Sequence, residues 1–210
     1  MTTLVVIAKE CIPGKVKTRL HPPFSLEQAA SLAAASLADT FSAVAALPAS
    51  RRVLAFEGNL LPPGSEHYDV ITQSTGDLDM RLAAIFDQCS GPTVLIGMDT
   101  PQLKANMLVP AFTWSPGTDA WFGAANDGGF WALGLAEPDG SLIKGVPMSR
   151  DDTGEVQLRR LAEAGLTVRH LETLVDVDTI SDAREVAADA PSTRFARALA
   201  SFDNVDGSES

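Results

Sequence analysis

Short runs of apolar, often β-branched residues alternate along this chain with segments in which apolar residues recur every three or four positions. The short runs predict strands and the spaced pattern predicts helices. Thr3–Lys9 and Pro92–Asp99 are almost entirely apolar between their ends, which is typical of strands buried on both faces. Further strands are predicted at Arg51–Phe56, Asp69–Gln73, Asp119–Asn126, Phe130–Ala136 and Leu166–Leu171, and the segment Val175–Thr179 is expected to be extended.

Helices are predicted between these strands. The first begins at Ser25, which forms an S-x-x-Q capping box with Gln28, and its apolar face continues until Pro48. The others are predicted at Leu78–Cys89, Asn106–Phe112, Glu155–Ala164 and Ser181–Ala188. This alternation predicts an α/β fold with a mostly parallel sheet and one antiparallel hairpin. We expect a single domain over residues 1–202, followed at 203–210 by a disordered acidic tail.

Composition narrows the class of protein. The 210 residues are 45% hydrophobic and 20% charged, which excludes collagen-like and wholly disordered chains. The net charge of −11 disfavours nucleic acid and anionic membranes as partners. No apolar run approaches the roughly 20 residues of a membrane span, and the N-terminus lacks a signal-peptide pattern. With only two cysteines, Cys11 and Cys89, we expect a cytoplasmic protein.

A cationic segment follows the first predicted strand. Residues 9–19 carry Lys9, Lys15, Lys17 and Arg19 against a single acid, Glu10. In extended backbone the last three cations would share one side and could neutralise a triphosphate. The segment is not a P-loop, because Lys9 stands where that motif needs its first glycine. The alternative interpretation is a solvated run of charges.

Three aspartates stand where strands or extended segments end. Asp99 directly follows a buried strand, and Asp176 and Asp178 share one face of an extended segment. Carboxylate oxygens are the ligands that Mg²⁺ prefers, so these residues are candidate metal ligands. For each of them, capping of the following helix is the alternative.

Two polar turns are further candidates. Gln73–Leu78 joins a strand to a helix and could hold a base or ribose together with Arg81. Asn126–Trp131 contains two glycines that would let a ligand approach the backbone, and Asp127 could bind a metal or an acceptor hydroxyl. The alternative is that both are ordinary turns. The three histidines show no metal-ligand spacing, and no G-x-S-x-G motif is present.

In this order, five segments resemble the motifs of a bacterial family of GT-A-like transferases of unassigned substrate. This family is related to 2-phospho-L-lactate guanylyltransferase and to the molybdenum-cofactor guanylyltransferases. The segments are Lys9–Leu20, Gln73–Arg81, Gly97–Pro101, Asp127–Leu135 and Asp176–Asp182, and the resemblance spans about residues 3–190. The chain departs from the pattern at Cys11, Asp79, Phe130 and Met148–Arg150.

The resemblance implies a GT-A-type, Rossmann-like three-layer sandwich that binds a nucleotide at the carboxyl edge of its sheet. It implies Asp99 and Asp178 as ligands of Mg²⁺ or Mn²⁺, with Asp176 in support, and catalytic roles for Lys17, Arg19 and Asp99. The nucleotide-binding residues would be Ala8, Lys9, Gly14, Lys15, Lys17, Arg19, Gln73, Gly76, Asp77 and Arg81. The acceptor side would be bordered by Asp127, Gly128 and Gly129.

The expected function is therefore metal-dependent transfer from a nucleotide donor to a small-molecule acceptor. The concentrated cations favour a nucleotidyltransferase that joins a nucleoside triphosphate to a phosphorylated acceptor and releases pyrophosphate. The alternatives are a glycosyltransferase that uses a nucleotide sugar and a non-catalytic nucleotide-binding sensor. The oligomeric state stays open, with a homodimer as one alternative.

Overall fold

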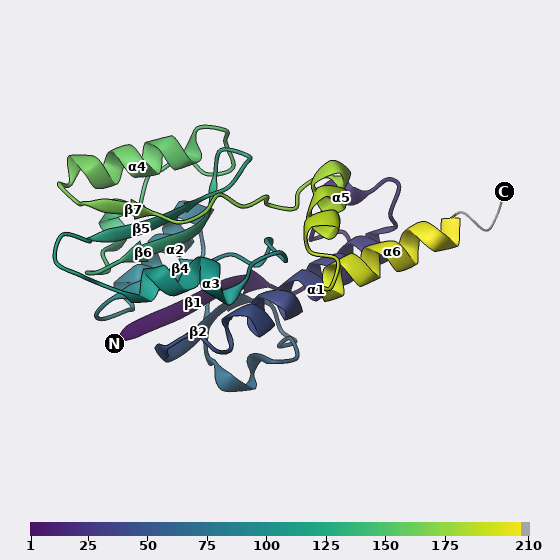
Figure 1. Ribbon diagram of the computed structural model, residues 1–210, viewed down its shortest axis with the longest axis horizontal. Coiled ribbons are helices and arrows are strands. Elements are labelled where there is room, and N and C mark those ends of the chain that lie inside the picture. Colours follow the sequence, from purple (N-terminus) through teal and green to yellow (C-terminus); the bar gives the residue numbers. More distant parts are fainter. Residues whose placement is uncertain (207–210) are drawn as a thin grey trace.

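One mixed sheet organises residues 1–206, the part of the chain that the computed structural model describes (Figure 1). Its seven strands lie in the order β3-β2-β1-β4-β6-β5-β7. The strands are β1 (Thr2–Lys9), β2 (Ala49–Glu57), β3 (Asp69–Thr72), β4 (Thr93–Ile96), β5 (Ala120–Ala124), β6 (Phe130–Leu135) and β7 (Val168–His170). Strand β6 is antiparallel to both its neighbours, β4 and β5, whereas every other pair is parallel. The mostly parallel sheet with one hairpin is thus confirmed.

The strand directions bring distant loops to one edge of the sheet. The carboxyl ends of parallel strands lie at the same edge, where ligands of open α/β sheets bind. The segments that follow β1, β2, β3, β4, β5 and β7 therefore converge there. The turn at residues 125–129, which joins β5 to the antiparallel strand β6, is one of these segments.

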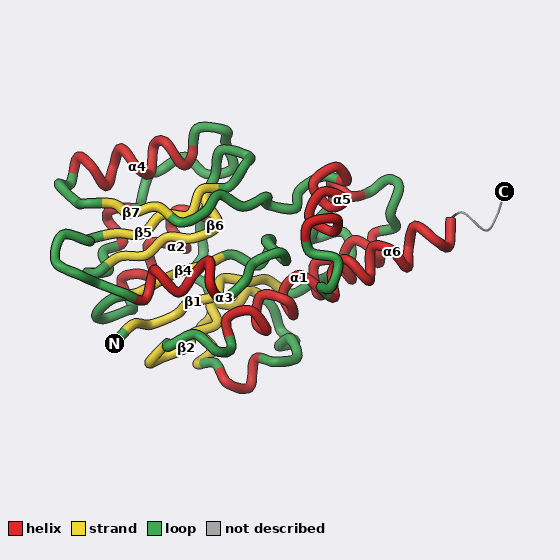
Figure 2. Tube along the Cα trace, viewed as in Figure 1, coloured by secondary structure: helices red, strands yellow, loops and turns green. Residues whose placement is uncertain are grey.

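Helices cover both faces of the sheet and make three layers, as the resemblance implied (Figure 2). The helices are α1 (Leu26–Val44), α2 (Leu78–Asp87), α3 (Ala105–Leu108), α4 (Thr153–Glu163), α5 (Ile180–Asp189) and α6 (Arg194–Asp206). Four short 3₁₀ helices are η1 (Thr18–Leu20), η2 (Ser65–His67), η3 (Val109–Phe112) and η4 (Gly140–Leu142). Strand β1 shows why both faces must be covered: Leu4 and Val6 pack in the cluster under α1, and Val5 packs in the cluster under α2 and α4.

A second, smaller body of helices lies beyond the sheet, and we call it the helical lobe. It consists of η1, α5, α6 and the N-terminal part of α1, which extends from the sheet toward α5 and α6 (Figure 1). Its own core contains Phe24, Leu32, Val177 and Phe195. Because α1 contributes to the cores of both bodies, it joins them.

Helix α6 corrects the sequence interpretation. We expected no helix after Ala188 and a tail from residue 203, but α6 continues to Asp206. The cause is a distant residue: the buried carboxylate of Asp39 accepts hydrogen bonds from the backbone N–H groups of Arg194 and Phe195, which begin α6. Residues 207–210 of the predicted tail lie outside the described residues.

Smaller differences concern element boundaries. The helix predicted at Asn106–Phe112 is divided into α3 and η3, because Pro110 has no N–H to continue the α-helical hydrogen bonds. Strand β7 is shorter than predicted, and Val175–Thr179, which we expected to be extended, contains no helix and forms no strand of the sheet. No helix within residues 1–206 is long and apolar enough to cross a lipid bilayer.

Candidate functional site

A cleft of about 840 Å³ lies along the carboxyl edge of the sheet. Ten sequence-predicted residues line it: Ala8, Lys9, Arg19, Gln73, Arg81, Asp99, Asp127, Gly129, Asp176 and Asp178. An adjoining cavity of about 170 Å³ is lined by Lys17 and shares Lys9, Arg19, Asp99 and Asp178 with the cleft. Five sequence-predicted residues line neither cavity: Gly14, Lys15, Gly76, Asp77 and Gly128.

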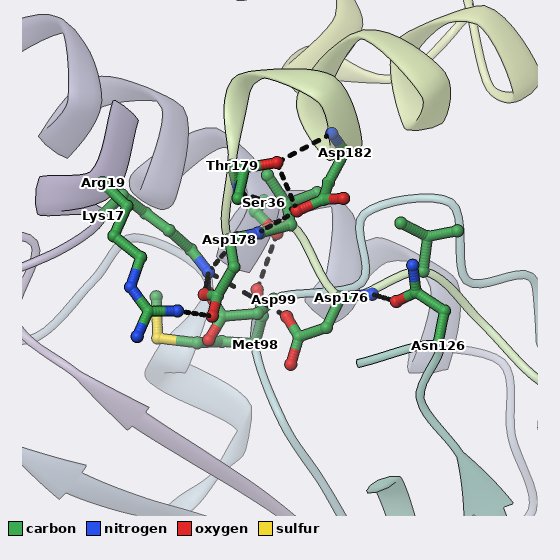
Figure 3. A network of polar contacts seen from close by, with 12 residues as sticks. Lys17, Arg19, Ser36, Met98, Asp99, Asn126, Asp176, Asp178, Thr179 and Asp182 are labelled. Atoms are coloured by element: carbon green, nitrogen blue, oxygen red, sulfur yellow. Dashed lines mark hydrogen bonds and ion pairs between the residues drawn. The ribbon is translucent and has the colours of Figure 1, made fainter. Parts of the chain in front are cut away.

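Lys17 lies at the centre of the acidic residues (Figure 3). Its Nζ is 2.7 Å from Asp99 Oδ1, 3.5 Å from Asp178 Oδ1 and 3.9 Å from Asp176 Oδ1, and it donates to the backbone carbonyl of Val177. Only 8% of the Lys17 side chain is exposed. Burial alone would lower the pKa of Lys17, but the carboxylates around it raise that pKa above its ordinary value. Lys17 is therefore held in its charged form.

Asp99 is positioned by the sheet. It follows β4, and the backbone on both sides of it is anchored: Ser36 Oγ on α1 donates to the carbonyl of Met98 at 2.6 Å, and Val177 N donates to the carbonyl of Asp99 at 3.0 Å. The strand thus fixes the place of this carboxylate, and α1 and the segment before α5 fix its direction.

Asp176 and Asp178 are positioned by the helical lobe. Successive side chains of an extended segment point to opposite sides, and the side chain of Val177 between them is fully buried in the lobe core. The two carboxylates therefore turn away from that core and toward Lys17. Asn126 Oδ1 accepts from Asp176 N at 3.1 Å, and Asp182, whose carboxylate completes the capping box of α5, accepts from Asp178 N at 3.2 Å.

Asp176 has the most perturbed carboxyl group of the cleft. Its burial, together with repulsion from Asp99, Asp178 and Asp127, raises the pKa of Asp176 to about 7, although Lys17 opposes the shift. Its Oδ1 atom is buried and has no hydrogen-bond partner among the described residues. An oxygen in this state is available to a further positively charged group.

The cationic segment does not form the one-sided row that we predicted. Lys17 has left-handed backbone, with φ of 46°, and Gly14 has φ of 77°, so the segment turns instead of running straight. As a result Lys17 is buried, Lys15 is exposed outside the cleft, and Arg19 is 72% exposed, with its NH1 3.0 Å from Asp178 Oδ2. The prediction of three cations sharing one face was wrong, because it assumed extended backbone.

A polar network closes the other end of the cleft, after β1, β2 and β3. Gln73 Nε2 donates to the carbonyl of Ala8 at 2.8 Å, while Arg81 donates to Gln73 Oε1 and to the carbonyl of Gly76. Arg81 NH1 also lies 2.7 Å from Glu57 Oε2. The sequence analysis missed Glu57, although it ends β2 and directly follows the buried run Val53–Phe56.

The Asp-Gly-Gly turn faces the cleft with only part of its length. Asp127 and Gly129 line it, and Asp127 Oδ1 accepts from Gly129 N at 2.9 Å. A Cβ atom on Gly128 would lie 1.9 Å from the carbonyl oxygen of Asp151, so Gly128 is needed for close packing against the start of α4. The segment Met148–Arg150, where the chain departs from the resembled motif, also lines the cleft, as does Asp151. We had not predicted its contribution.

The charge of the cleft is negative. Seven carboxylates line it against four cations. Within residues 1–206, no three His, Cys, Asp or Glu side chains are grouped so that they could hold a metal ion. Lys17 stands among the carboxylates that were predicted as ligands. Binding of a polyphosphate here would therefore require further positive charge.

Comparison in sequence identifies a family. Residues 30–150, more than half of the chain, match the family described as "Uncharacterized protein conserved in bacteria (DUF2064)". A search of curated proteins finds no match.

Comparison with solved structures identifies the fold. A protein described as a candidate nucleotide-diphospho-sugar transferase from Desulfovibrio desulfuricans G20 is 22% identical, with a TM-score of 0.84 over 97% of this chain and 95% of that one. A nucleotidyl transferase from Methanothermobacter thermautotrophicus is 14% identical, with a TM-score of 0.60 over 94% and 98%. Rv0371c from Mycobacterium tuberculosis H37Rv, in complex with manganese, is 19% identical, with a TM-score of 0.51 over 88% and 96%. These similarities confirm the fold that the resemblance implied.

Proposed function

The chain belongs to the DUF2064 family, and on this premise we propose that it is a metal-dependent transferase that uses a nucleotide donor. The specific reaction that we propose is transfer of a nucleoside monophosphate from a triphosphate to a small phosphorylated acceptor. The observation that carries the proposal is the convergence of Asp99, Asp176 and Asp178 on Lys17 beside a cleft of about 840 Å³ at the carboxyl edge. The two unpaired cysteines support a cytoplasmic location as part of the proposal.

The donor atoms of the cleft are of the kind that a divalent cation takes, although in this structure Lys17 stands among the carboxylates and no three of them are grouped as a ready-made metal site within residues 1–206. Asp99 and Asp178 offer carboxylate oxygens at 2.7 and 3.5 Å from the same Lys17 Nζ, and the buried Asp176 Oδ1 has no hydrogen-bond partner among the described residues. Such oxygens suit Mg²⁺ and Mn²⁺, and the excess of carboxylates in the cleft calls for added positive charge. When bound, the metal would neutralise phosphate oxygens and polarise the phosphorus that is attacked.

The residues of the chain would bind and orient the reactants. In this proposal Lys9 and Arg19, which line the cleft, hold phosphate oxygens, and Arg81, which also lines it, contacts the nucleoside or the acceptor. In the transfer step, an oxygen of the acceptor phosphate attacks the α-phosphorus of the triphosphate. The bond from that phosphorus to the α–β bridging oxygen breaks, and pyrophosphate leaves with the electron pair. Cations near the leaving group would stabilise its developing charge, so no protein nucleophile is required.

Glycosyl transfer is the second candidate, and one observation favours it. Lys17 and Arg19 are already paired with carboxylates of the cleft, so the cationic segment offers less free charge than its sequence suggested. A nucleotide sugar carries fewer phosphates than a triphosphate and needs less neutralisation. The same cleft would then release a nucleoside diphosphate.

The first experiment is thermal denaturation of the protein with each nucleoside triphosphate and with nucleotide sugars, each with and without Mg²⁺ or Mn²⁺. A ligand at about 100 times its Kd stabilises the folded state by about 2.7 kcal/mol. A metal-dependent shift with one triphosphate supports nucleotidyl transfer and identifies the base. A shift confined to a nucleotide sugar transfers the proposal to the glycosyltransferase.

Asp99→Asn tests whether binding leads to turnover. With the substrates so identified, we expect this variant to lose about 10²–10³-fold in the transfer rate, because it removes a proposed ligand of the metal that would stabilise the negative charge of the transition state. Asp189→Asn is the matched control, since it removes the same charge from an exposed position at the end of α5. Nucleotide binding without turnover in the unaltered protein would contradict the enzyme and favour a sensor.

A further inference from the structure

Lys17 occupies the position that a metal ion would take among these carboxylates. Its ammonium group is the cation shared by Asp99, Asp176 and Asp178, at 2.7, 3.9 and 3.5 Å. An ammonium group and a divalent cation both compensate the same negative charge, but they cannot be in one place. The two must therefore compete for the three carboxylates.

The backbone conformation of Lys17 depends on the contacts that its side chain makes. The residue has left-handed backbone, which costs a side chain-bearing residue about 1–2 kcal/mol and persists only where surrounding contacts enforce it. It lies between the loop after β1 and η1, and its cavity of about 170 Å³ shares five lining residues with the large cleft. Asp99 and Asp178 thus face both the cavity of Lys17 and the cleft where phosphates would bind.

We propose that Lys17 and the divalent cation exchange at the carboxylate cluster of Asp99, Asp176 and Asp178. In the resting protein Lys17 neutralises the cluster. When metal enters, the ammonium group of Lys17 leaves Asp99 and faces the cleft, where it binds a phosphate of the donor. This inference rests on the proposed function for the identity of the donor, but the exchange itself concerns the metal and the protein alone.

The exchange makes the binding of metal and nucleotide cooperative. A metal ion that binds without nucleotide must displace Lys17 from its buried ion pairs. Its apparent affinity is therefore the intrinsic affinity multiplied by the fraction of molecules in which Lys17 has left the carboxylates. A nucleotide that receives Lys17 removes part of that cost. By reciprocity, the metal then strengthens the binding of the nucleotide by the same factor.

The test is the affinity for Mn²⁺ alone, without nucleotide, measured by titration calorimetry. We compare the unaltered protein with Lys17→Met and with Lys144→Met, a matched control at an exposed lysine outside both cavities. We expect Lys17→Met to bind Mn²⁺ at least about tenfold more tightly, because no ammonium group competes, and Lys144→Met to be unchanged. Equal or weaker binding by Lys17→Met overturns the exchange and makes Lys17 a residue that holds the carboxylates in place.

A second measurement uses the unaltered protein and so does not depend on the folding of a variant. Buried lysines react slowly with small acylating reagents, and mass spectrometry reports the extent of labelling at Lys17 and Lys144 separately. We expect Mn²⁺ alone to accelerate labelling of Lys17 several-fold while that of Lys144 stays constant. Unchanged or slower labelling of Lys17 in the presence of bound Mn²⁺ overturns the exchange.

The outcomes separate this inference from the proposed function. Equal Mn²⁺ affinities together with metal-dependent nucleotide binding overturn the exchange and leave the transferase. Tighter Mn²⁺ binding by Lys17→Met without any nucleotide binding supports the exchange and removes the transferase. Absence of Mn²⁺ binding in all three proteins overturns both.

Discussion

The sheet and the helical lobe contribute to the same cleft in different ways. The sheet supplies Asp99 at the end of a strand that is covered on both faces, with its backbone anchored by α1. The lobe supplies Asp178 from the extended segment before α5 and Arg19 from η1, a single turn of 3₁₀ helix. The cleft is therefore assembled where a rigid body meets a smaller one, and its geometry depends on how well the two fit.

The two bodies differ in the size of their cores. Among the residues whose burial the structure describes, nine buried hydrophobic residues form the lobe cluster, against 23 and 14 in the two clusters of the sheet. Regions with few buried apolar contacts open locally at lower free energy than the core of the molecule. We therefore expect the lobe to be the part that opens first, and with it the part of the cleft that carries Asp176 and Asp178.

The largest expected effects on stability come from substitutions that leave a cavity of similar size in each of the two cores. Phe122→Ala in the sheet and Phe195→Ala in the lobe each empty a fully buried site, and such changes cost about 3–5 kcal/mol. We expect Phe122→Ala to lower the protection of backbone amides against hydrogen exchange throughout the molecule. Phe195→Ala should lower it mainly in α5 and α6. Native-state hydrogen exchange with mass spectrometry measures both. Equal loss of protection in both bodies would show that they unfold as one unit and would remove the distinction.

The next effect compares the carboxylate on α1 that caps the lobe helix α6 with a carboxylate at the edge of the sheet. Asp39 begins α6 from a side chain that is only 8% exposed, whereas Asp69 pairs with Arg51 at the edge of the sheet and is 63% exposed. We expect Asp39→Asn to lower the free energy of unfolding of the lobe by about 1–2 kcal/mol, because Asn has one acceptor oxygen and leaves one of the two backbone N–H groups without a partner. Asp69→Asn should cost less than about 1 kcal/mol, since exposed ion pairs stabilise little. Chemical denaturation compares them, and equal costs would contradict the special role of Asp39.

The smallest predicted effect lies where the bodies meet. The pKa of Asp176 is raised to about 7, so the folded protein keeps a proton that the unfolded chain has released near pH 4. Stability of the metal-free protein should therefore fall as the pH rises from about 4 to about 7. Asp176→Asn has no carboxyl group to lose this proton. We therefore expect the free energy of unfolding of the variant, relative to that of the unaltered protein, to be higher at pH 8 than at pH 5 by on the order of 1 kcal/mol. Chemical denaturation in the presence of a chelator measures the difference. Identical pH profiles of stability for the two proteins would contradict the raised pKa of Asp176.

The sheet was predictable because its signals are local. Apolar runs define β1 and β4, and a polar residue directly after such a run, as at Asp99, marks the carboxyl edge. The capping box of Ser25 was visible for the same reason, since both partners lie within one turn. Such features need no knowledge of what packs where.

The lobe was less predictable because contacts between distant residues determine it. Helix α6 begins at a carboxylate more than 150 positions earlier in the chain, on Asp39. The burial of Lys17 depends on Asp99 and Asp178, and its left-handed backbone leaves no mark in a pattern of apolar residues. Glu57 escaped notice because its partner Arg81 is on another element.

Val177 links the chemistry of the cleft to the packing of the lobe. Its side chain belongs to the lobe core, its N–H is bonded to Asp99, and its carbonyl accepts from Lys17. In evolutionary terms, the Asp-Val-Asp segment is thus under two selective pressures that act on alternate residues, one for charge and one for volume. A lineage could keep every acid of the cleft and still lose its arrangement through a single change of apolar side chain at this position.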